Sequence, residues 1–216
     1  MTSGDLLEIF RDEMDDRVEP YLWSDDLCYG YINDAQQMFY RLTDGIPDGT
    51  TPEVTLLSIE PATEWYATHP SILKIRDAYR VDTGAPVTIY NQEDMASYGL
   101  RFNGRPGSLR ALVIGIEDFK ARAWPVPNET VDIQLTVFRL PLVDVVDDQP
   151  LNVADQHQVH LLLWVKHRAY SKQNAETFDR TRAKEFDEAF RTYCKAAKDE
   201  QRRAKHKPRA VLYGGI

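Results

Sequence analysis

The sequence predicts an α+β protein in which two helical segments flank a β-rich centre along the chain. Apolar residues recur with helical spacing before residue 45 and again after residue 150. Ten of the twelve prolines lie between Ile46 and Pro150, where they separate runs rich in β-branched and aromatic residues. We therefore expect a bundle of four helices formed by residues 1–45 and 151–204, an inserted antiparallel β module (sandwich or barrel-like) at 46–150, and an extended C-terminal tail at 205–216.

The first helix of an N-terminal hairpin is predicted up to Pro20, because proline cannot continue a helix. Thr2 or Ser3 is a suitable N-cap. The apolar face is expected to contain Leu6, Leu7, Phe10, Met14 and Val18. The solvent-exposed face is expected to carry the acids Glu8, Asp12, Asp15 and Asp16.

The second helix of the hairpin is predicted from Ser24, its cap candidate, to the stop signal Asp44-Gly45. Asp25 and Asp26 lie in the first turn, where the helix dipole favours negative charge. Its apolar stripe comprises Leu27, Tyr31, Ile32, Ala35, Phe39 and Leu42.

The β module is predicted from six runs of strand-forming residues: Val54–Ile59, Ser71–Val81, Pro86–Tyr90, Leu109–Ile116, Phe119–Trp124 and Thr130–Leu140. Trp124–Asn128 is expected to be a hairpin connection, since it holds two prolines between two such runs. Asn91–Tyr98 is expected to form one short helix.

Two further helices are predicted after Pro150. Val153–Tyr170 is apolar almost all round, which is typical of a buried helix. Asn174 is expected to cap a long helix that reaches Ala204, with one face formed by Phe178, Phe186, Ala189, Phe190, Tyr193 and Ala197.

The C-terminal tail, residues 205–216, is the strongest candidate for a binding segment. Its first half is basic, and the apolar run Ala210–Tyr213 precedes Gly214-Gly215. A segment this short does not fold alone, and we expect it to add to another protein as a strand. The alternative is an ordinary frayed terminus.

Charge and composition bound the remaining possibilities. The net charge of −8 divides unevenly: residues 1–60 hold fourteen acids and three arginines, whereas residues 195–209 hold seven basic residues and two acids. Such a division suggests different partners for the two ends, or two solvated faces. The chain lacks an apolar run long enough to cross a membrane and lacks a secretory signal, so we expect no membrane partner. Cys28 and Cys194 are expected to be small core residues in a reducing compartment.

The sequence offers little catalytic chemistry. His157, His160 and His167 share a predicted helix, but no Cys or acid stands at ligand spacing to complete a metal site. The adjacent acids Asp15-Asp16, Asp25-Asp26 and Asp147-Asp148 are expected to be helix-dipole partners and solubilising groups, and Asn103–Gly107 lacks the phosphate-binding glycine patterns. We therefore expect no catalytic residue, no metal, no cofactor and no enzymatic activity.

The order of these parts resembles the head-to-tail adaptor (connector) proteins of tailed bacteriophages. The resemblance covers nearly the whole chain and is carried by several stretches together. These are Leu22–Leu27 with Gly30–Gln36, Leu73–Ile75, the helix containing Met95, Gly104–Pro106, Trp124–Pro127, Phe138–Pro141, Ala169–Gln173 with Asp179, and Arg209–Gly215.

The resemblance implies a structural virion protein at the neck, present in the host cytoplasm during assembly. Copies, usually twelve in this family, would form a ring beneath the portal, contact a downstream tail, nozzle or tail-tube protein, and let DNA pass through the lumen without sequence-specific binding. The portal-docking tail would comprise Lys205, Lys207, Pro208, Arg209, Val211, Leu212, Tyr213, Gly214 and Gly215. The alternatives are another neck ring component, such as a stopper or tail terminator, and a cell-wall or nucleic-acid hydrolase.

Overall fold

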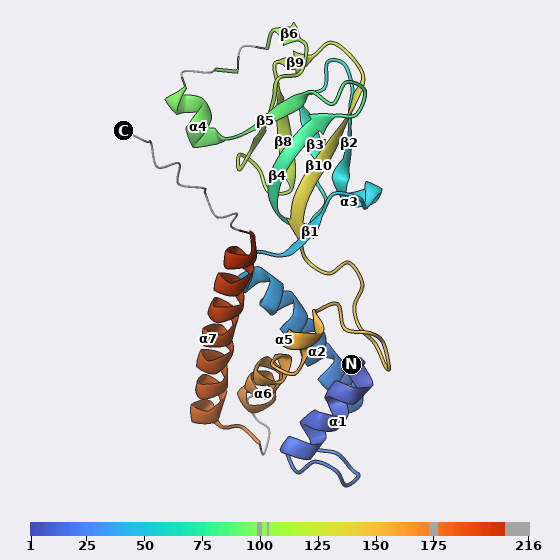
Figure 1. Cartoon of the computed structure of the whole chain (residues 1–216), viewed down its shortest axis with the longest axis vertical. Helices are drawn as coiled ribbons and strands as arrows, with labels where there is room; N and C mark the ends of the chain where they lie inside the picture. Colours follow the sequence, from blue (N-terminus) through green and yellow to red (C-terminus); the bar gives the residue numbers. More distant parts are fainter. Residues whose placement is uncertain (99–100, 103, 173–176, 206–216) are drawn as a thin grey trace, which may run out of the picture. The chain divides into compact units, whose positions relative to one another are not determined.

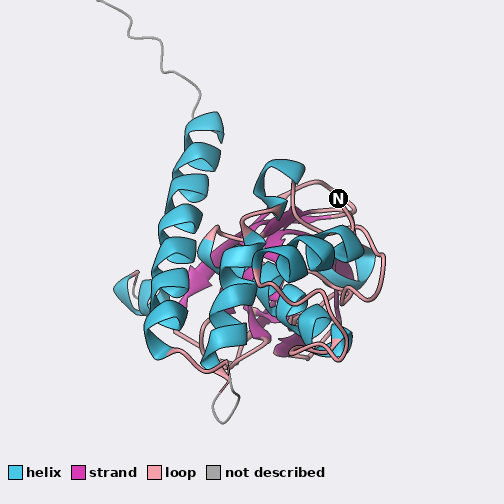
Figure 2. Cartoon of the chain, turned by 90° about the horizontal axis from the view of Figure 1, so that it is seen from below, coloured by secondary structure: helices cyan, strands magenta, loops and turns pink. Residues whose placement is uncertain are grey.

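The computed structural model describes residues 1–98, 101–102, 104–172 and 177–205, and the chain divides into two compact units. The helical unit combines Met1–Asp44 with the chain from Val143 onward, and the β unit is Gly45–Leu142. Figure 1 shows the longer helices in the first unit and the strands in the second, and Figure 2 colours the helices cyan and the strands magenta. The sequence prediction had placed residues 143–150 with the strands, whereas the structure joins them to the helices.

The helical unit contains more helices than the predicted four. The residue 153–170 segment is not one helix, because the bonds His157 N–H to Ala154 O (2.8 Å) and His160 N–H to His157 O (3.1 Å) form tight turns that interrupt the α-helical ladder. The predicted four-helix arrangement is therefore not confirmed in that form. The helices described in this unit are α1 (Ser3–Glu13), α2 (Asp25–Leu42), α5 (Asp155–Gln158), α6 (Leu161–Ser171) and α7 (Arg180–Lys205).

Helix α1 begins at a capping box and ends earlier than predicted. The Thr2 hydroxyl accepts the Asp5 N–H at 3.2 Å, and the Asp5 carboxylate accepts the Thr2 N–H at 2.8 Å. The helix ends at Glu13 because Asp15 adopts a left-handed backbone conformation with φ 54°. Val18 lies beyond this end and is 80% exposed, so its predicted place on the apolar face is wrong.

The connection from α1 to α2 is organised by the buried guanidinium of Arg11. Arg11 Nη1 lies 2.9 Å from Asp16 Oδ2, Arg11 Nη2 donates to the Trp23 carbonyl at 3.1 Å and also pairs with Asp25, and the group lies over the Tyr21 ring. Asp16 was predicted on the exposed face, but its side chain is 2% exposed. An acid this deeply buried needs a cation, and Arg11 supplies it.

Helix α2 packs as its apolar stripe predicted. Tyr31, Ile32, Ala35 and Phe39 are buried, while Leu27 and Leu42 are partly buried against the same core. On another face, Asp34 accepts from Trp164 Nε1 at 2.8 Å and from Arg168 Nη1 at 2.9 Å, which ties α2 to α6. Helices α1, α6 and α7 contribute Leu6, Phe10, Leu161, Val165 and Phe190 to the same core, and the connecting segments contribute Trp23, Val145, Leu151 and Val153.

The segment that returns from the β unit, Val143–Val153, is bound to the first two helices. The Asn33 side chain bonds both to the Val145 carbonyl (2.7 Å) and to the Val145 N–H (2.6 Å). The Gln36 side-chain oxygen Oε1 accepts the Asn152 N–H at 2.7 Å, and the Ser3 hydroxyl donates to the Val146 backbone carbonyl at 2.6 Å. These bonds explain why the segment belongs to the helical unit.

The β unit is built on one curled sheet in the order β1-β10-β4-β5-β7-β8-β3, with β2 also paired to β10 (Figure 1). The prediction of a purely antiparallel module is wrong, because β5–β7 and β6–β9 are parallel pairs. The strands are β1 (Ile46–Asp48), β2 (Leu56–Ile59), β3 (Trp65–Ala67), β4 (Ile72–Arg80), β5 (Pro86–Asn91), β6 (Pro106–Gly107), β7 (Ala111–Ile114), β8 (Lys120–Trp124), β9 (Val126–Pro127) and β10 (Val131–Arg139).

Two short helices accompany the sheet. Helix α4 (Gln92–Ser97) agrees with the helix predicted at 91–98. Helix α3 (Pro52–Thr55) occupies the start of the predicted Val54–Ile59 strand, because Pro52 stands in its first turn, where a missing N–H costs nothing. The predicted Trp124–Asn128 connection contains β9, which pairs with β6.

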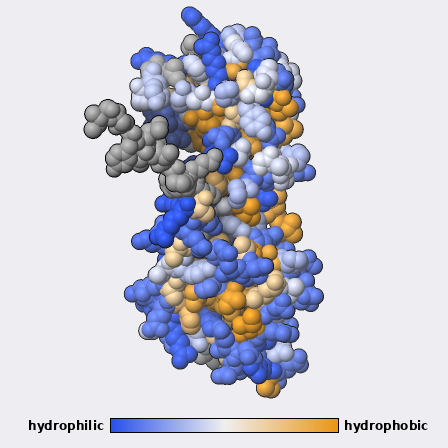
Figure 3. Space-filling model, in the orientation of Figure 1, coloured by the Kyte–Doolittle hydropathy of each residue, from blue (hydrophilic) through white to orange (hydrophobic). Residues whose placement is uncertain are grey.

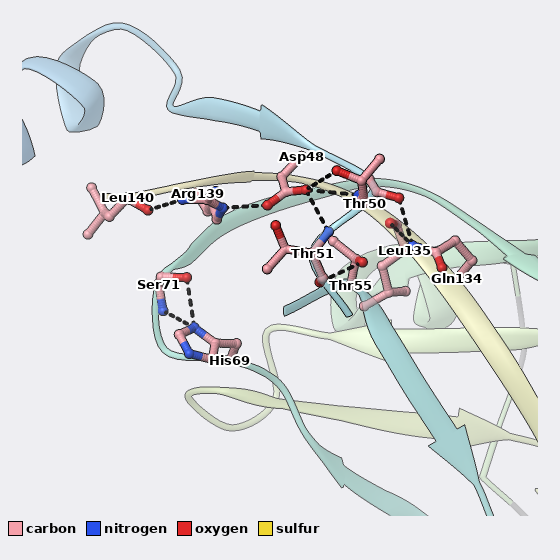
Figure 4. A network of polar contacts seen from close by, with 11 residues as sticks. Asp48, Thr50, Thr51, Thr55, His69, Ser71, Gln134, Leu135, Arg139 and Leu140 are labelled. Carbon is pink, nitrogen blue, oxygen red and sulfur yellow. Dashed lines mark hydrogen bonds and ion pairs between the residues drawn. The ribbon is translucent and has the colours of Figure 1, made fainter. Parts of the chain in front are cut away.

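A polar network centred on Asp48 fixes the start of the sheet (Figure 4). Asp48 accepts from the N–H groups of Thr50 (2.9 Å) and Thr51 (3.1 Å) and from Arg139 Nε (2.6 Å). Burial alone would raise the pKa of Asp48, but these hydrogen bonds hold that pKa well below its ordinary value. The network therefore stabilises the β unit above the carboxyl's unfolded pKa, and the contribution is lost as the pH falls through the folded pKa.

No helix in the described parts of the chain has the length and apolar character needed to cross a membrane.

We predict that Arg11→Ala destabilises the helical unit by about 3 kcal/mol, because Asp16 would remain buried without its cation. The matched control is Arg17→Ala, since Arg17 is 64% exposed and its pair with Asp12 lies at the surface. Hydrogen exchange of α1 and α2 amides reports the loss. Equal exchange in the two variants would contradict the role assigned to Arg11.

Candidate functional site

The predicted docking tail begins at the C-terminal end of α7. Lys205 is the last residue of that helix. The other predicted docking residues lie outside the described part of the chain: Lys207, Pro208, Arg209, Val211, Leu212, Tyr213, Gly214 and Gly215. What the structure provides is the helix from which the tail departs, and the contacts that fix it.

Helix α7 begins later than predicted. Asp179 Oδ1 accepts the N–H groups of Thr181 (2.9 Å) and Arg182 (3.0 Å), so Asp179 caps the helix. The predicted cap, Asn174, lies outside the described residues, and Phe178 precedes the helix and is 45% exposed. The face that packs on the core contains Ala183, Phe190, Cys194 and Ala197.

The last turns of α7 are held to the end of α2 by Asp44. Asp44 follows α2 with φ 78°, a left-handed conformation that ends the helix before Gly45. Its carboxylate lies 2.5 Å from Lys198 Nζ and 3.8 Å from Arg202 Nη2. The basic end of α7, which precedes the tail, is therefore tied to the helical unit by Asp44, the acid that follows α2.

A second attachment joins α7 to α5 through His157 and Tyr193. His157 Nδ1 lies 2.7 Å from the Tyr193 hydroxyl, and the His160 ring stacks on the Tyr193 ring with centroids 3.7 Å apart. His157 is 4% exposed. Burial lowers the pKa of His157 below its ordinary value. The nearby charge of Glu200 raises that pKa, and the nearby His160 lowers it further.

Two other residues considered for chemistry, His167 and Asp147, make structural contacts. His167 Nδ1 lies 2.8 Å from the Ala183 carbonyl oxygen, and Asp147 accepts from the Tyr29 hydroxyl. Within the described residues, no group of three or more metal-binding side chains gathers at one point. Cys28 and Cys194 are buried free thiols, as predicted, and burial raises the pKa of each to about 12.

Comparison with known protein families decides the family. The model of the SU10 adaptor protein family matches residues 1–211, and so spans both units. The chain belongs to the SU10 adaptor protein family. It is accordingly a phage structural adaptor protein, associated with the virion. No curated protein matches the chain at a significant level.

Several contacts that organise the adaptor's helical unit were not predicted from the sequence. Asp44 was recognised only as a stop signal, although Lys198 and Arg202 on the distant helix supply a matching basic pair. The sequence does indicate an ion pair for Arg11, since seven acids surround it in the first twenty residues. Spacing alone does not reveal which acid such an arginine selects.

We predict that the adaptor's helical unit loses stability as the pH falls below about 6.5, the ordinary histidine pKa. The folded pKa of His157 is lowered, so the unfolded chain binds the proton first and unfolding is favoured as the pH falls through that range. Urea unfolding at pH 7.5 and 5.5 measures the change. His157→Gln is expected to reduce it, whereas His69→Gln in the β unit is the control and is expected to leave it unchanged.

Proposed function

We propose that this adaptor forms an oligomeric ring beneath the portal of a tailed phage, where it joins the DNA-filled head to the tail and continues the DNA channel. The observation that carries the proposal is the family match over residues 1–211. We propose three refinements of that membership: the head-to-tail placement, the ring, and a copy number of twelve, which the resemblance implies.

The position of α7 supports a docking role for the C-terminal tail. Its last turns pair with Asp44, the residue that follows α2 by two positions, so the helix that precedes the tail contacts the end of α2. Lys205, Lys207 and Arg209 would approach acidic portal surface, which gains from electrostatic steering. Val211, Leu212 and Tyr213 would then supply the apolar contact, and Gly214-Gly215 would permit a close turn.

The charge of the remaining surface suits a channel that passes DNA without retaining it. The chain carries a net charge of −8, and exposed acids such as Glu8 and Asp12 stand on the outer face of α1. Acids facing a lumen would repel phosphates, so DNA would slide without sequence-specific binding. In this proposal the β unit contacts the downstream tail, nozzle or tail-tube protein.

We propose a structural role without an enzymatic step. Three of the acids and histidines that the sequence offers for catalysis make structural contacts: Asp16 and Asp25 bind Arg11, and His157 bonds Tyr193. A hydrolase would need two carboxylates in environments that separate their pKa values.

The proposal is tested by mixing the purified adaptor with assembled portal and imaging the product by negative-stain electron microscopy. We expect an added ring on the portal. Leu212→Asp is expected to abolish attachment, because a charge would replace the apolar anchor. Val18→Asp is the matched control, since Val18 is 80% exposed in a loop of the helical unit.

Portals that remain bare at high adaptor excess would contradict the proposal. Rings that form equally well with Leu212→Asp would retain the adaptor role but reject the docking tail. Folding of each variant is checked by circular dichroism before mixing.

A further inference from the structure

Strand β4 of the adaptor has one edge that is only partly covered. Its first edge pairs with β10 from Ile72 to Arg80. On the other edge, β5 pairs with β4 at Ala78 and Tyr79, and from Thr88 onward β5 pairs in parallel with β7. Among the described strands, therefore, none pairs with this edge of β4 from Ile72 to Asp77. Such an edge presents backbone donors and acceptors to an incoming strand.

A groove of about 260 Å³ lies beside this edge. One wall is the beginning of β4, with Ile72, Leu73 and Ile75, and the other is the connection from β7 to β8, with Ile114 and Phe119. Leu73 is 39% exposed and Phe119 is 58% exposed. The volume is below the ~300 Å³ at which small-molecule pockets begin, so the groove suits a few side chains of an extended peptide. Apolar surface is visible on the near face of the β unit in Figure 3.

Phe119 is held at the groove in an unusual backbone conformation. Its φ is 56°, which is rare for a bulky aromatic residue. The Thr68 N–H donates to the Phe119 carbonyl at 2.8 Å and fixes this conformation. Backbone strain that places an apolar ring in a groove is typical of binding sites.

The chain itself contains a segment that fits this groove. The described structure ends at Lys205 and eleven residues follow, among them the apolar run Ala210–Tyr213 directly after Arg209. The groove combines apolar walls with two acids, Glu117 and Asp118. Glu117 is paired with Lys120 at 2.7 Å, whereas no ion pair of Asp118 is found among the described residues, so Asp118 is the acid we assign to an incoming cation. Lys74 lies on the β4 wall of the groove, whereas both acids lie on the wall formed by the β7–β8 connection.

The uncovered edge of β4 and the apolar segment of the tail also agree in length. The uncovered edge from Ile72 to Asp77 is about 20 Å long at ~3.3 Å per residue, and a strand formed by Arg209–Tyr213 would be about 17 Å long. Alternate side chains of an added strand point to opposite faces, so only every second residue of the segment enters the groove.

We propose that the β4 groove binds residues 209–213 of a second copy of the chain as an added strand, with Arg209 toward Asp118. The interaction concerns the free adaptor and goes beyond the proposed function: the tail that is to dock on the portal has an earlier partner in another copy. It provides weak self-association before a portal is present.

The test is disulfide crosslinking between two full-length variants. Leu73→Cys is mixed with Leu212→Cys under mild oxidation, and dimers are counted by non-reducing electrophoresis. The native Cys28 and Cys194 are buried and do not compete. The matched control replaces the first variant with Tyr79→Cys, which lies on the same strand, is 41% exposed, and stands where β5 covers the edge.

We expect at least tenfold more dimer with Leu73→Cys than with Tyr79→Cys. No dimer, or equal yields in both mixtures, would overturn the proposal. A crosslink that forms within a single chain carrying both Leu73→Cys and Leu212→Cys, and not between chains, would overturn the assignment to a second copy. Portal rings are scored separately: crosslinks without rings contradict only the proposed function, and rings without crosslinks contradict only this inference.

Discussion

The helical unit depends on one constraint: its two halves are separated in the sequence by the whole β unit and must be joined by contacts. The returning segment Val143–Val153 meets this constraint because its backbone groups bond to the side chains of Asn33 and Gln36 on α2. Side-chain amides are well suited to the task, since each can donate and accept, and the Val145 groups that Asn33 satisfies belong to a buried residue. Once the segment is bound, α6 can pack on α2 through Asp34, and α7 can pack on α6. The position of α7 in the helical unit therefore depends on polar contacts of α2, a helix near the start of the chain.

The sequence predicted the elements whose signal is local. The apolar stripe of α2 and the long run that became β10 were recognised because side-chain periodicity reports burial on one face. Pairing partners were not recognised, because the parallel β5–β7 pair brings together segments whose own patterns do not state direction. Asp16 was misplaced because an acid at a helical position looks solvated until its partner, Arg11, is known. The break between α5 and α6 escaped detection because the residues around it carry no proline or glycine stop signal, and only the tight-turn hydrogen bonds reveal the interruption.

The composition of the candidate docking tail could be read from the sequence, but the contacts that hold the preceding helix could not. Composition identified a basic, apolar-tipped terminus, and the structure adds the base from which it departs, held by Asp44 and by the His157–Tyr193 contact. The uncovered edge of β4 could not be predicted, because it depends on β5 leaving β4 after two residue pairs. A terminus that carries an apolar run, and a sheet that leaves an edge open, are complementary features of the same chain. In our proposal these two features let copies of this adaptor associate through an added strand.

The most direct test of the adaptor account is a cryo-electron microscopy map of the chain assembled on its portal. The account predicts a closed ring of copies directly beneath the portal, with density for residues 206–216 on the portal surface and an open channel along the axis. A map in which the chain occupies another part of the tail, or in which the ring contacts the portal without the C-terminal residues, would contradict the central claim.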